Sequence, residues 1–305
     1  AKQSGADAVH PGYGLLSENP EFARLCAASN ITFIGPTPET MRRLGNKVEA
    51  RAIAIEAGVP VMPATKPLPQ DGKDIVALAN EIGFPLMLKA SWGGGGRGMR
   101  VIEEEAGLLE QVAAARREAK SAFGNDEVYL EKLVRNARHV EVQIIGDSHG
   151  QVVHLFERDC TVQRRHQKIV ERAPAPYLSQ TQRDEITSAA VRLAQSVQYC
   201  NTGTVEFLQD IDTGEFYFIE VNPRIQVEHT VTEQITGLDL VKSQIRIAAG
   251  GKIGDMNSSG IPTQDDIRMR GAAIQCRVTT EDPRNSFIPD YGHIVAYRSP
   301  AGPGI

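Results

Sequence analysis

Glu206 and Glu220 are the residues of this sequence best placed to do chemistry. Strand-forming residues surround both, over 204–209 and 216–222, and the Asp-Thr-Gly turn between them predicts a hairpin. In that hairpin the two glutamates lie opposite each other, with Asn222 next on the same face. Like charges directly opposite are destabilising, so we expect a hard cation such as Mg²⁺ to share these oxygens. The alternative is a solvated pair on an open sheet face.

Arg224, Gln226 and Glu228 follow this hairpin at once. The planar fork of Arg224 matches a carboxylate or a carbonate, and Gln226 can donate to a small oxyanion. Glu228 comes onto the same side if the segment stays extended, where it could act as a general base. A basic run at 164–168 suggests an anion site, although the usual fate of a charge run is a solvated loop.

A run of four glycines within 91–99 lies between two predicted strands. Without side chains there, backbone N–H groups can cradle phosphate oxygens, and Lys89 and Arg97 supply positive charge. The spacing is not that of a P-loop and no helix begins after it, which disfavours P-loop NTPases. A flexible linker would also be glycine-rich, but the flanking strands favour a lid that closes over phosphates.

Other polar residues are ambiguous when each is taken alone. Lys47 lies in a helical segment, which taken alone favours a solvated surface lysine, whereas Glu131 and Lys132, after a predicted strand, could be either solvated or functional. His139, on a polar strand face, is equally well a ribose ligand or an exposed residue. For Cys160 we expect a packing role rather than nucleophilic catalysis.

The bulk composition excludes several classes of protein. The 305 residues are 41% hydrophobic and 23% charged, with a net charge of −5. This charge argues against a nucleic-acid partner, and no apolar run is long enough to span a bilayer. The four cysteines form no C-x-x-C pair, which argues against zinc and disulfides and favours a reducing compartment. The chain begins with Ala1 and shows no signal peptide, and we expect both ends to be cut from a longer protein.

The order of predicted elements divides the chain into four parts. Residues 1–36 read as the C-terminal half of a parallel α/β subdomain, and 37–61 as connecting helices. Residues 62–134 read as an α/β lid subdomain. Residues 135–305 read as a strand-rich subdomain, which the family resemblance given below implies is the catalytic one, truncated at its C-terminal side.

Individual elements follow from caps and from hydrophobic periodicity. We expect the connecting helices to begin after Thr37, with proline at their first position. Leu108, Leu109, Val112 and Ala115 predict one face of a lid helix. In the catalytic part, the predicted strands include 150–158, and the predicted helices lie near 181–198 and 231–249.

Taken together, these motifs resemble the biotin carboxylase component of the biotin-dependent carboxylases, which have the ATP-grasp fold. The resembling segments cover nearly the whole chain and lie at 10–14, 89–99, 157–168, 206 and 220–229. Within the group the chain is most similar to the pyruvate carboxylase type, as Trp92, Thr230 and the segments 277–283 and 287–292 indicate. The implied fold class is α/β (α+β): an ATP-grasp fold with a remnant of the N-terminal pre-ATP-grasp subdomain and a Gly-rich lid.

The resemblance implies a role for each matching residue. ATP phosphates would be held by Lys47 and Lys89, with Gly95 and Gly96 closing over them. Adenine would be bound by Glu131, Lys132 and the backbone of Val134. The ribose and phosphate region would be lined by His139, Gln163 and His166. Mg²⁺ or Mn²⁺ would be bound by Glu206, Glu220 and Asn222. Bicarbonate would be held by Lys168, Arg224, Gln226 and the backbone of Val227, with Glu228 as the base.

The implied activity is the ATP- and Mg²⁺-dependent carboxylation of biotin by bicarbonate through carboxyphosphate. Biotin would be carried on a separate domain of a homo-oligomeric parent that also has a carboxyltransferase domain. That parent would make oxaloacetate from pyruvate, in gluconeogenesis and anaplerosis, in the bacterial cytoplasm or the mitochondrial matrix. We expect no nucleic-acid or membrane partner.

Two alternatives stay open. As a fragment, the chain would have impaired activity or act as a non-catalytic ATP-binding or assembly module. It could also be the biotin carboxylase of an acyl-CoA carboxylase. A carbamoyl-phosphate synthetase-like ligase is disfavoured, because it should lack the segments 226–229 and 10–14.

Overall fold

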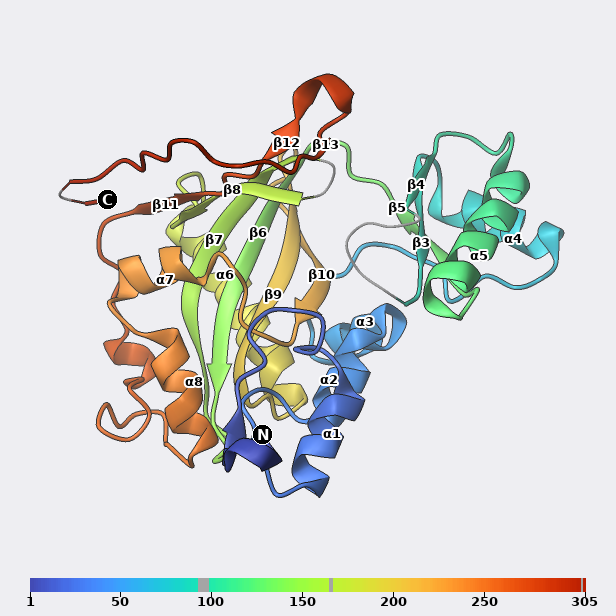
Figure 1. Ribbon diagram of the computed structural model, residues 1–305. Helices are drawn as coiled ribbons and strands as arrows, with labels where there is room; N and C mark the ends of the chain where they lie inside the picture. Colours follow the sequence, from blue (N-terminus) through green and yellow to red (C-terminus); the bar gives the residue numbers. More distant parts are fainter. Residues whose placement is uncertain (93–98, 165–166, 303) are drawn as a thin grey trace.

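A computed structural model describes residues 1–92, 99–164, 167–302 and 304–305. The predicted lid glycines Gly95 and Gly96, and also His166, lie outside these described residues. A large sheet forms the centre, helices cover both of its faces, and a smaller α/β unit stands to one side (Figure 1). Among the described residues, no helix is both long and apolar enough to cross a bilayer.

The N-terminal part is a parallel α/β unit, as predicted. Strands β1 (Ala8–Val9) and β2 (Thr32–Phe33) pair in parallel, and α1 (Pro20–Ala28) connects them. Helices α2 (Pro38–Gly45) and α3 (Lys47–Glu56) follow. Thr37 caps α2 through its side chain, which confirms the predicted start, and Asn46 caps α3 in the same way.

The side unit is a three-stranded sheet covered by two helices. The sheet has the order β4-β3-β5, and its strands are β3 (Leu86–Ala90), β4 (Arg100–Ile102) and β5 (Val128–Lys132). Its helices are α4 (Gly72–Ile82) and α5 (Leu108–Phe123). The predicted apolar face of α5 is confirmed for Leu108, Val112 and Ala115, which are buried. The prediction was wrong for Leu109, which is 45% exposed.

The central sheet has six strands in the order β10-β9-β6-β7-β8-β11. These strands are β6 (Ala137–Gly146), β7 (Val152–Arg164), β8 (Gln167–Ala173), β9 (Asn201–Asp210), β10 (Phe216–Asn222) and β11 (Ala273–Cys276). The helices around it are α6 (Gln180–Ser196), α7 (His229–Thr236) and α8 (Leu240–Ala248). Beyond the sheet, β12 (Glu281–Asp282) pairs with β13 (Ile288–Pro289).

Two predictions need correction here. The strand expected at 150–158 continues to Arg164, so this first residue of the basic run belongs to the strand and not to a loop after it. The described residues of the run belong to β7 and β8, which pair with each other. The single helix expected at 231–249 is two helices, because Gly237 ends α7 in the left-handed conformation at φ 71°.

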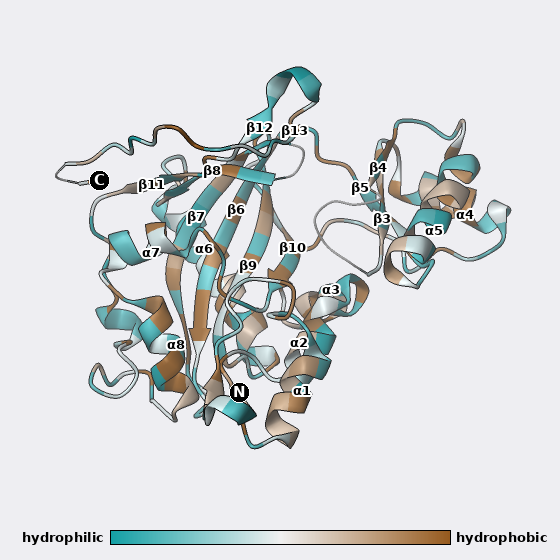
Figure 2. Ribbon diagram, in the orientation of Figure 1, coloured by the Kyte–Doolittle hydropathy of each residue, from teal (hydrophilic) through white to brown (hydrophobic). Residues whose placement is uncertain are grey.

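The two faces of the central sheet differ in character because side chains alternate along each strand. Val140, Val142 and Ile144 pack with α6 in the main hydrophobic core. Residues at odd positions of β6, such as His139 and Glu141, point to the other face, where α7 and α8 lie. Figure 2 shows hydrophilic colour over parts of β8 and at the neighbouring strand ends, and this is where the candidate site lies.

Candidate active site

Four charged residues form one row across the central sheet. Arg158 on β7 is the register partner of Glu141 on β6, Glu141 is the partner of Glu206 on β9, and Glu206 is the partner of Glu220 on β10. The predicted pairing of Glu206 with Glu220 is thus confirmed. The hairpin register shifts between Phe218 and Glu220, and this bulge brings the two glutamates into register.

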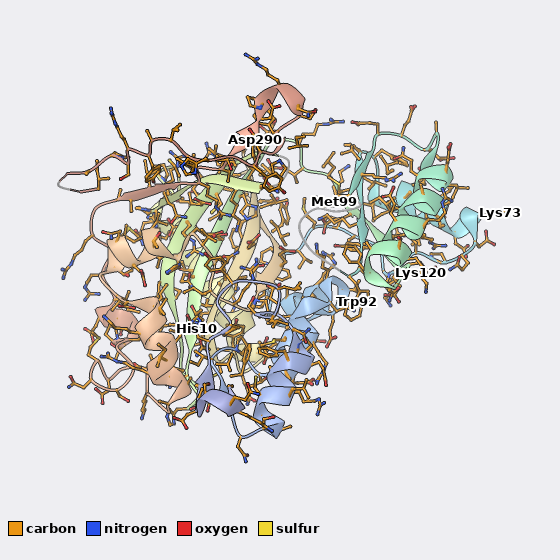
Figure 3. All side chains as sticks on the ribbon, in the orientation of Figure 1. His10, Lys73, Trp92, Met99, Lys120 and Asp290 are labelled. Atoms are coloured by element: carbon orange, nitrogen blue, oxygen red, sulfur yellow. The ribbon has the colours of Figure 1, made fainter. Side chains whose placement is uncertain are left out.

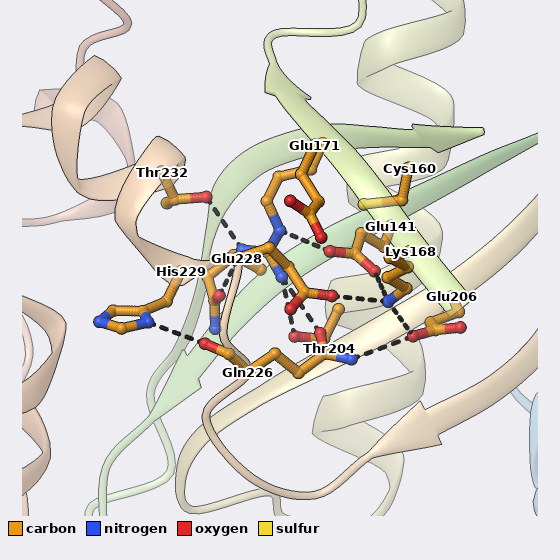
Figure 4. Close-up of polar contacts among 12 residues, drawn as sticks. Glu141, Cys160, Lys168, Glu171, Thr204, Glu206, Gln226, Glu228, His229 and Thr232 are labelled. Carbon is orange, nitrogen blue, oxygen red and sulfur yellow. Dashed lines mark hydrogen bonds and ion pairs between the residues drawn. The ribbon is translucent and has the colours of Figure 1, made fainter. Parts of the chain in front are cut away.

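Lys168, on β8, is the centre of the ion-pair network (Figure 4). Its Nζ lies 2.7 Å from Glu206 Oε1 and 2.8 Å from Glu228 Oε1, and it also pairs with Glu141. Burial opposes the charge on this lysine, but the surrounding carboxylates outweigh it. The pKa of Lys168 is therefore held well above its ordinary value, and the side chain is a permanent cation in the site.

Glu206 is the carboxylate with the most partners. Besides Lys168, it lies 2.9 Å from His139 Nε2 and accepts from Asn222 Nδ2 at 2.7 Å. Burial alone would raise the pKa of Glu206, but Lys168 and His139 hold it well below its usual range. Burial would lower the pKa of His139, yet the Glu206 charge raises it. His139 is therefore partly buried beside an acid, not exposed on an open strand face.

Glu228 reaches this cluster through a turn. The segment 224–228 does not stay extended, which was the condition for placing Glu228 beside Arg224 and Gln226, because the chain turns at Val227 and Glu228, and α7 begins at His229. Glu228 Oε2 lies 2.8 Å from Arg277 Nη2, on the opposite side of the carboxylate from Lys168. Gln226, two residues earlier, donates from Nε2 to Glu206 Oε1 at 3.1 Å.

Arg224 lies at the end of the site that faces the N-terminal part. It donates from Nε to Glu18 Oε1 at 2.9 Å and from Nη2 to Asn222 Oδ1 at 3.2 Å. The carbonyl of Val227 accepts from Gln275 Nε2 at 3.3 Å. The N-terminal loop and β11 thus both support the segment that follows the hairpin.

The predicted nucleotide residues Lys47, Lys89, Glu131 and Lys132 lie on helix α3 and on the side unit. Lys47, the first residue of α3, lies 3.3 Å from Glu220 Oε2. Lys89 pairs with Glu131 across β3 and β5, and Glu131 lies within β5 rather than after it. Lys132 donates from Nζ to the carbonyls of Gly83 and Phe84, at 2.8 and 3.0 Å.

One cavity of about 770 Å³ joins the predicted nucleotide residues to the Lys168 cluster. It lies between the side unit and the central sheet, and its volume is in the range of small-molecule and cofactor sites. Figure 3 labels Met99, which lines the cavity, and Trp92 on the same side of the side unit. The lining contains every predicted site residue that the structure describes: Lys47, Lys89, Glu131, Lys132, Val134, His139, Gln163, Lys168, Glu206, Glu220, Asn222, Arg224, Gln226, Val227 and Glu228.

Sequence reasoning missed several charged residues of this region. Glu141 and Arg158 are fully buried in the network, Arg277 pairs with Glu228, and Glu18 pairs with Arg224. Glu141 had a usable signal, because it alternates with His139 along a strand and so shares its face. The other three come from segments distant in sequence and carry no local signal. Cys160 is buried, and burial raises its pKa well above the ordinary value, in keeping with the packing role expected for it.

Comparison with known proteins identifies families and relatives that the chain matches. Residues 46–256 match the family described as carbamoyl-phosphate synthase L chain, ATP binding domain, and residues 1–41 match biotin carboxylase, N-terminal domain. The chain is 54% identical to pyruvate carboxylase of Staphylococcus aureus over all of its length, which is 26% of that relative. It therefore spans about a quarter of the length of the curated relatives that it matches.

Solved structures of carboxylases also match almost the whole of the chain. A Rhizobium etli pyruvate carboxylase with acetyl coenzyme A matches with a TM-score of 0.93 and 65% identity, over 99% of this chain and 26% of that one. The biotin carboxylase domain dimer of Hydrogenobacter thermophilus 2-oxoglutarate carboxylase matches with a TM-score of 0.92 and 46% identity, over 99% of this chain and 65% of that one. That structure is a complex with MgADP, ADP and bicarbonate.

Proposed function

Because this chain belongs to the biotin carboxylase component of the pyruvate carboxylases, we propose that it uses ATP and bicarbonate to carboxylate biotin. The observation that carries the proposal is the convergence of Glu206 and Glu228 on Lys168 in one cavity, where Gln226 donates to the same Glu206. An anion placed there would meet a buried cation, an amide donor and a carboxylate able to take a proton.

In the first stage, Lys168, Arg224, Gln226 and the backbone of Val227 hold bicarbonate. Glu228 accepts its proton, and the bicarbonate oxygen attacks the γ-phosphate of ATP to give carboxyphosphate and ADP. Enzymes accelerate such phosphoryl transfers mainly by positioning the reactants and by stabilising charge. Carboxyphosphate would then break down to phosphate and CO₂, and biotin would supply the ureido nitrogen that bonds to CO₂ while its N–H proton passes to that phosphate. Lys168 and Arg277 hold Glu228 from two sides, and this fixes the base before substrate arrives.

The nucleotide would lie along the side-unit wall of the cavity. Lys47 and Lys89 are the cations for its phosphates, and Glu131, Lys132 and the backbone of Val134 are the contacts for adenine. His139 and Gln163 line the ribose and phosphate region. The roles of Gly95, Gly96 and His166 stay predictions, since these residues lie outside the described part of the chain.

Glu206, Glu220 and Asn222 are the residues that would hold Mg²⁺ or Mn²⁺. Their oxygens are hard donors on adjacent strands of the cavity wall, and so the donor set fits such an ion. The bound ion would neutralise charge on the ATP phosphates. Lys47 and Lys168 balance the negative charges of Glu220 and Glu206, respectively.

For the whole parent protein we propose pyruvate as the final acceptor, with biotin on a carrier domain and transfer on a carboxyltransferase domain. The support is the 54% identity to named pyruvate carboxylases over the full chain. The dimer of the related biotin carboxylase domain supports a homo-oligomeric parent.

The test is phosphate release from ATP and Mg²⁺ by this chain, with and without bicarbonate and free biotin. We expect bicarbonate to stimulate release, and Glu228→Gln to abolish the stimulation while ATP still binds. Glu185→Gln, an exposed acid on α6, serves as the control and should keep full stimulation. ATP binding without any bicarbonate-dependent release would instead favour the non-catalytic ATP-binding module.

A further inference from the structure

Arg158 is a buried charge for which the proposed reaction has no use. Its side chain is 0% exposed, and it does not belong to the lining of the cavity. Taking a guanidinium out of water is costly unless the group is paired and fully hydrogen-bonded. The contacts of Arg158 therefore show what its burial accomplishes.

The guanidinium donates to acceptors from four different segments. Strand β6, strand β9, helix α7 and the turn before α7 each contribute, and the acceptors labelled in Figure 4 include Thr204, Thr232 and Gln226. The five bonds are Nε to Glu141 Oε1 at 2.5 Å, Nη1 to Gln143 Oε1 at 2.6 Å and to Thr232 Oγ1 at 3.0 Å, and Nη2 to Thr204 Oγ1 at 3.1 Å and to Gln226 Oε1 at 3.2 Å.

The bond to Gln226 decides how its amide is oriented. A guanidinium has donors only, so the Gln226 atom that faces it must be the oxygen. The amide nitrogen then points the other way, toward Glu206 and the cavity that Gln226 lines. An oxyanion entering the cavity meets an N–H donor, whereas the reversed amide would present a repelling oxygen.

The bond to Glu141 acts on a second residue of the same site. One oxygen of Glu141 accepts from Arg158, and the other pairs with Lys168 Nζ. Arg158 therefore restrains Lys168 through Glu141, and it restrains Gln226 by a direct hydrogen bond. Both residues belong to the set proposed to hold bicarbonate.

We propose that Arg158 is the positioning residue of the anion site. It fixes the Gln226 amide with its donor toward the cavity and holds Lys168 through Glu141, so that the site is organised before the anion binds. This inference rests on the proposed function for the identity of the anion as bicarbonate. The orientation of the Gln226 amide does not depend on that identity.

The first experiment measures KM for bicarbonate and for ATP in Arg158→Lys. A lysine keeps the charge but cannot reach the same set of acceptors, so we expect KM for bicarbonate to rise by about tenfold or more while KM for ATP changes by less than about twofold. Thr232→Val is the matched control, because it removes one hydrogen bond of Arg158 that does not connect it to a proposed bicarbonate ligand. Both KM values of this control should stay unchanged. Equal changes in both KM values of Arg158→Lys, or no change, would overturn the proposal.

The second measurement needs neither turnover nor a folded variant. An atomic-resolution crystal structure of the unaltered chain distinguishes the Gln226 oxygen from its nitrogen. Oxygen toward Arg158 supports the positioning role; nitrogen toward Arg158, or a side chain turned away from it, overturns that role. Absence of bicarbonate-dependent ATP cleavage in the unaltered chain would count against the proposed function, and the amide orientation would still decide the positioning role.

Discussion

Glu206 and Glu220 are register partners in the β9–β10 hairpin, yet each carboxylate binds a different lysine. Lys168 Nζ, from β8, lies 2.7 Å from Glu206, and Lys47 Nζ, from the start of α3, lies 3.3 Å from Glu220. Two separate parts of the fold thus relieve the repulsion between neighbouring acids. Any metal ion bound between these carboxylates joins cations that the protein already supplies.

Glu220→Gln should weaken binding of Mn²⁺ in the presence of ADP by at least about tenfold, because affinity for a hard cation depends on the number of charged oxygen ligands. Titration followed by the electron paramagnetic resonance of free Mn²⁺ measures this directly. Glu215→Gln, an exposed acid near the turn of the same hairpin, is the control and should bind as the unaltered chain does. Equal affinities in the two variants would rule out Glu220 as a ligand.

Lys168→Met should destabilise the fold by about 3–5 kcal/mol, because it leaves buried carboxylates without their shared cation. Urea unfolding at pH 7 measures the free energy. Lys242→Met is the matched control: its ion pair with Asp239 spans 3.0 Å, but the lysine side chain is 72% exposed. We expect that control to cost at most about 1 kcal/mol. Similar losses for both lysines would contradict the central role of Lys168.

Lys89→Met should raise the Kd for ATP by about tenfold to a hundredfold, the usual effect of losing one charge-assisted hydrogen bond. Isothermal titration calorimetry with Mg²⁺ present measures the affinity. Lys73 lies in the same side unit but at its exposed outer end (Figure 3). Lys73→Met is therefore the control, and its Kd for ATP should equal that of the unaltered chain. An unchanged Kd in Lys89→Met would remove this lysine from the phosphate site.

His154 should make the protein lose stability on acidification. Burial lowers the pKa of His154 to about 4, and its Nδ1 accepts from the backbone N–H of Phe156 at 3.3 Å, which requires the neutral ring. Its unfolded pKa is about 6.5, so the unfolded chain takes up this proton first as the pH falls. Stability is therefore lost between about pH 6.5 and pH 4, by up to about 3 kcal/mol.

Denaturant unfolding across that range tests this. His154→Gln should lose less stability between pH 6.5 and pH 4 than the unaltered chain, since it cannot take up the proton. His293→Gln, at an exposed position, should follow the unaltered chain. If His154→Gln shows the same pH slope as the unaltered chain, the buried neutral histidine is not a source of the acid sensitivity.

Much of the candidate site could be predicted because its residues are close together in sequence. Strand periodicity places Glu206, Glu220 and Asn222 on one face, and Arg224 to Glu228 follow within a few residues. Whether that last segment stays extended could not be predicted. An extended chain and a turn leading into a helix cannot be distinguished from so short a stretch, and the turn is stabilised by Arg158, Lys168 and Arg277 from elsewhere.

The partners of the acids, in contrast, follow from the order of the strands. Lys168, Arg158 and Arg277 reach Glu228 or its neighbours because β7 and β8 lie beside β6, with β11 at the edge. These contacts join residues from 46 to 74 positions apart in the chain. The face of the sheet to which each side chain points follows from the alternation of side chains along the strand, which is a local property. Which cation neutralises which buried carboxylate depends on strand pairing over long distances, and no local pattern specifies it.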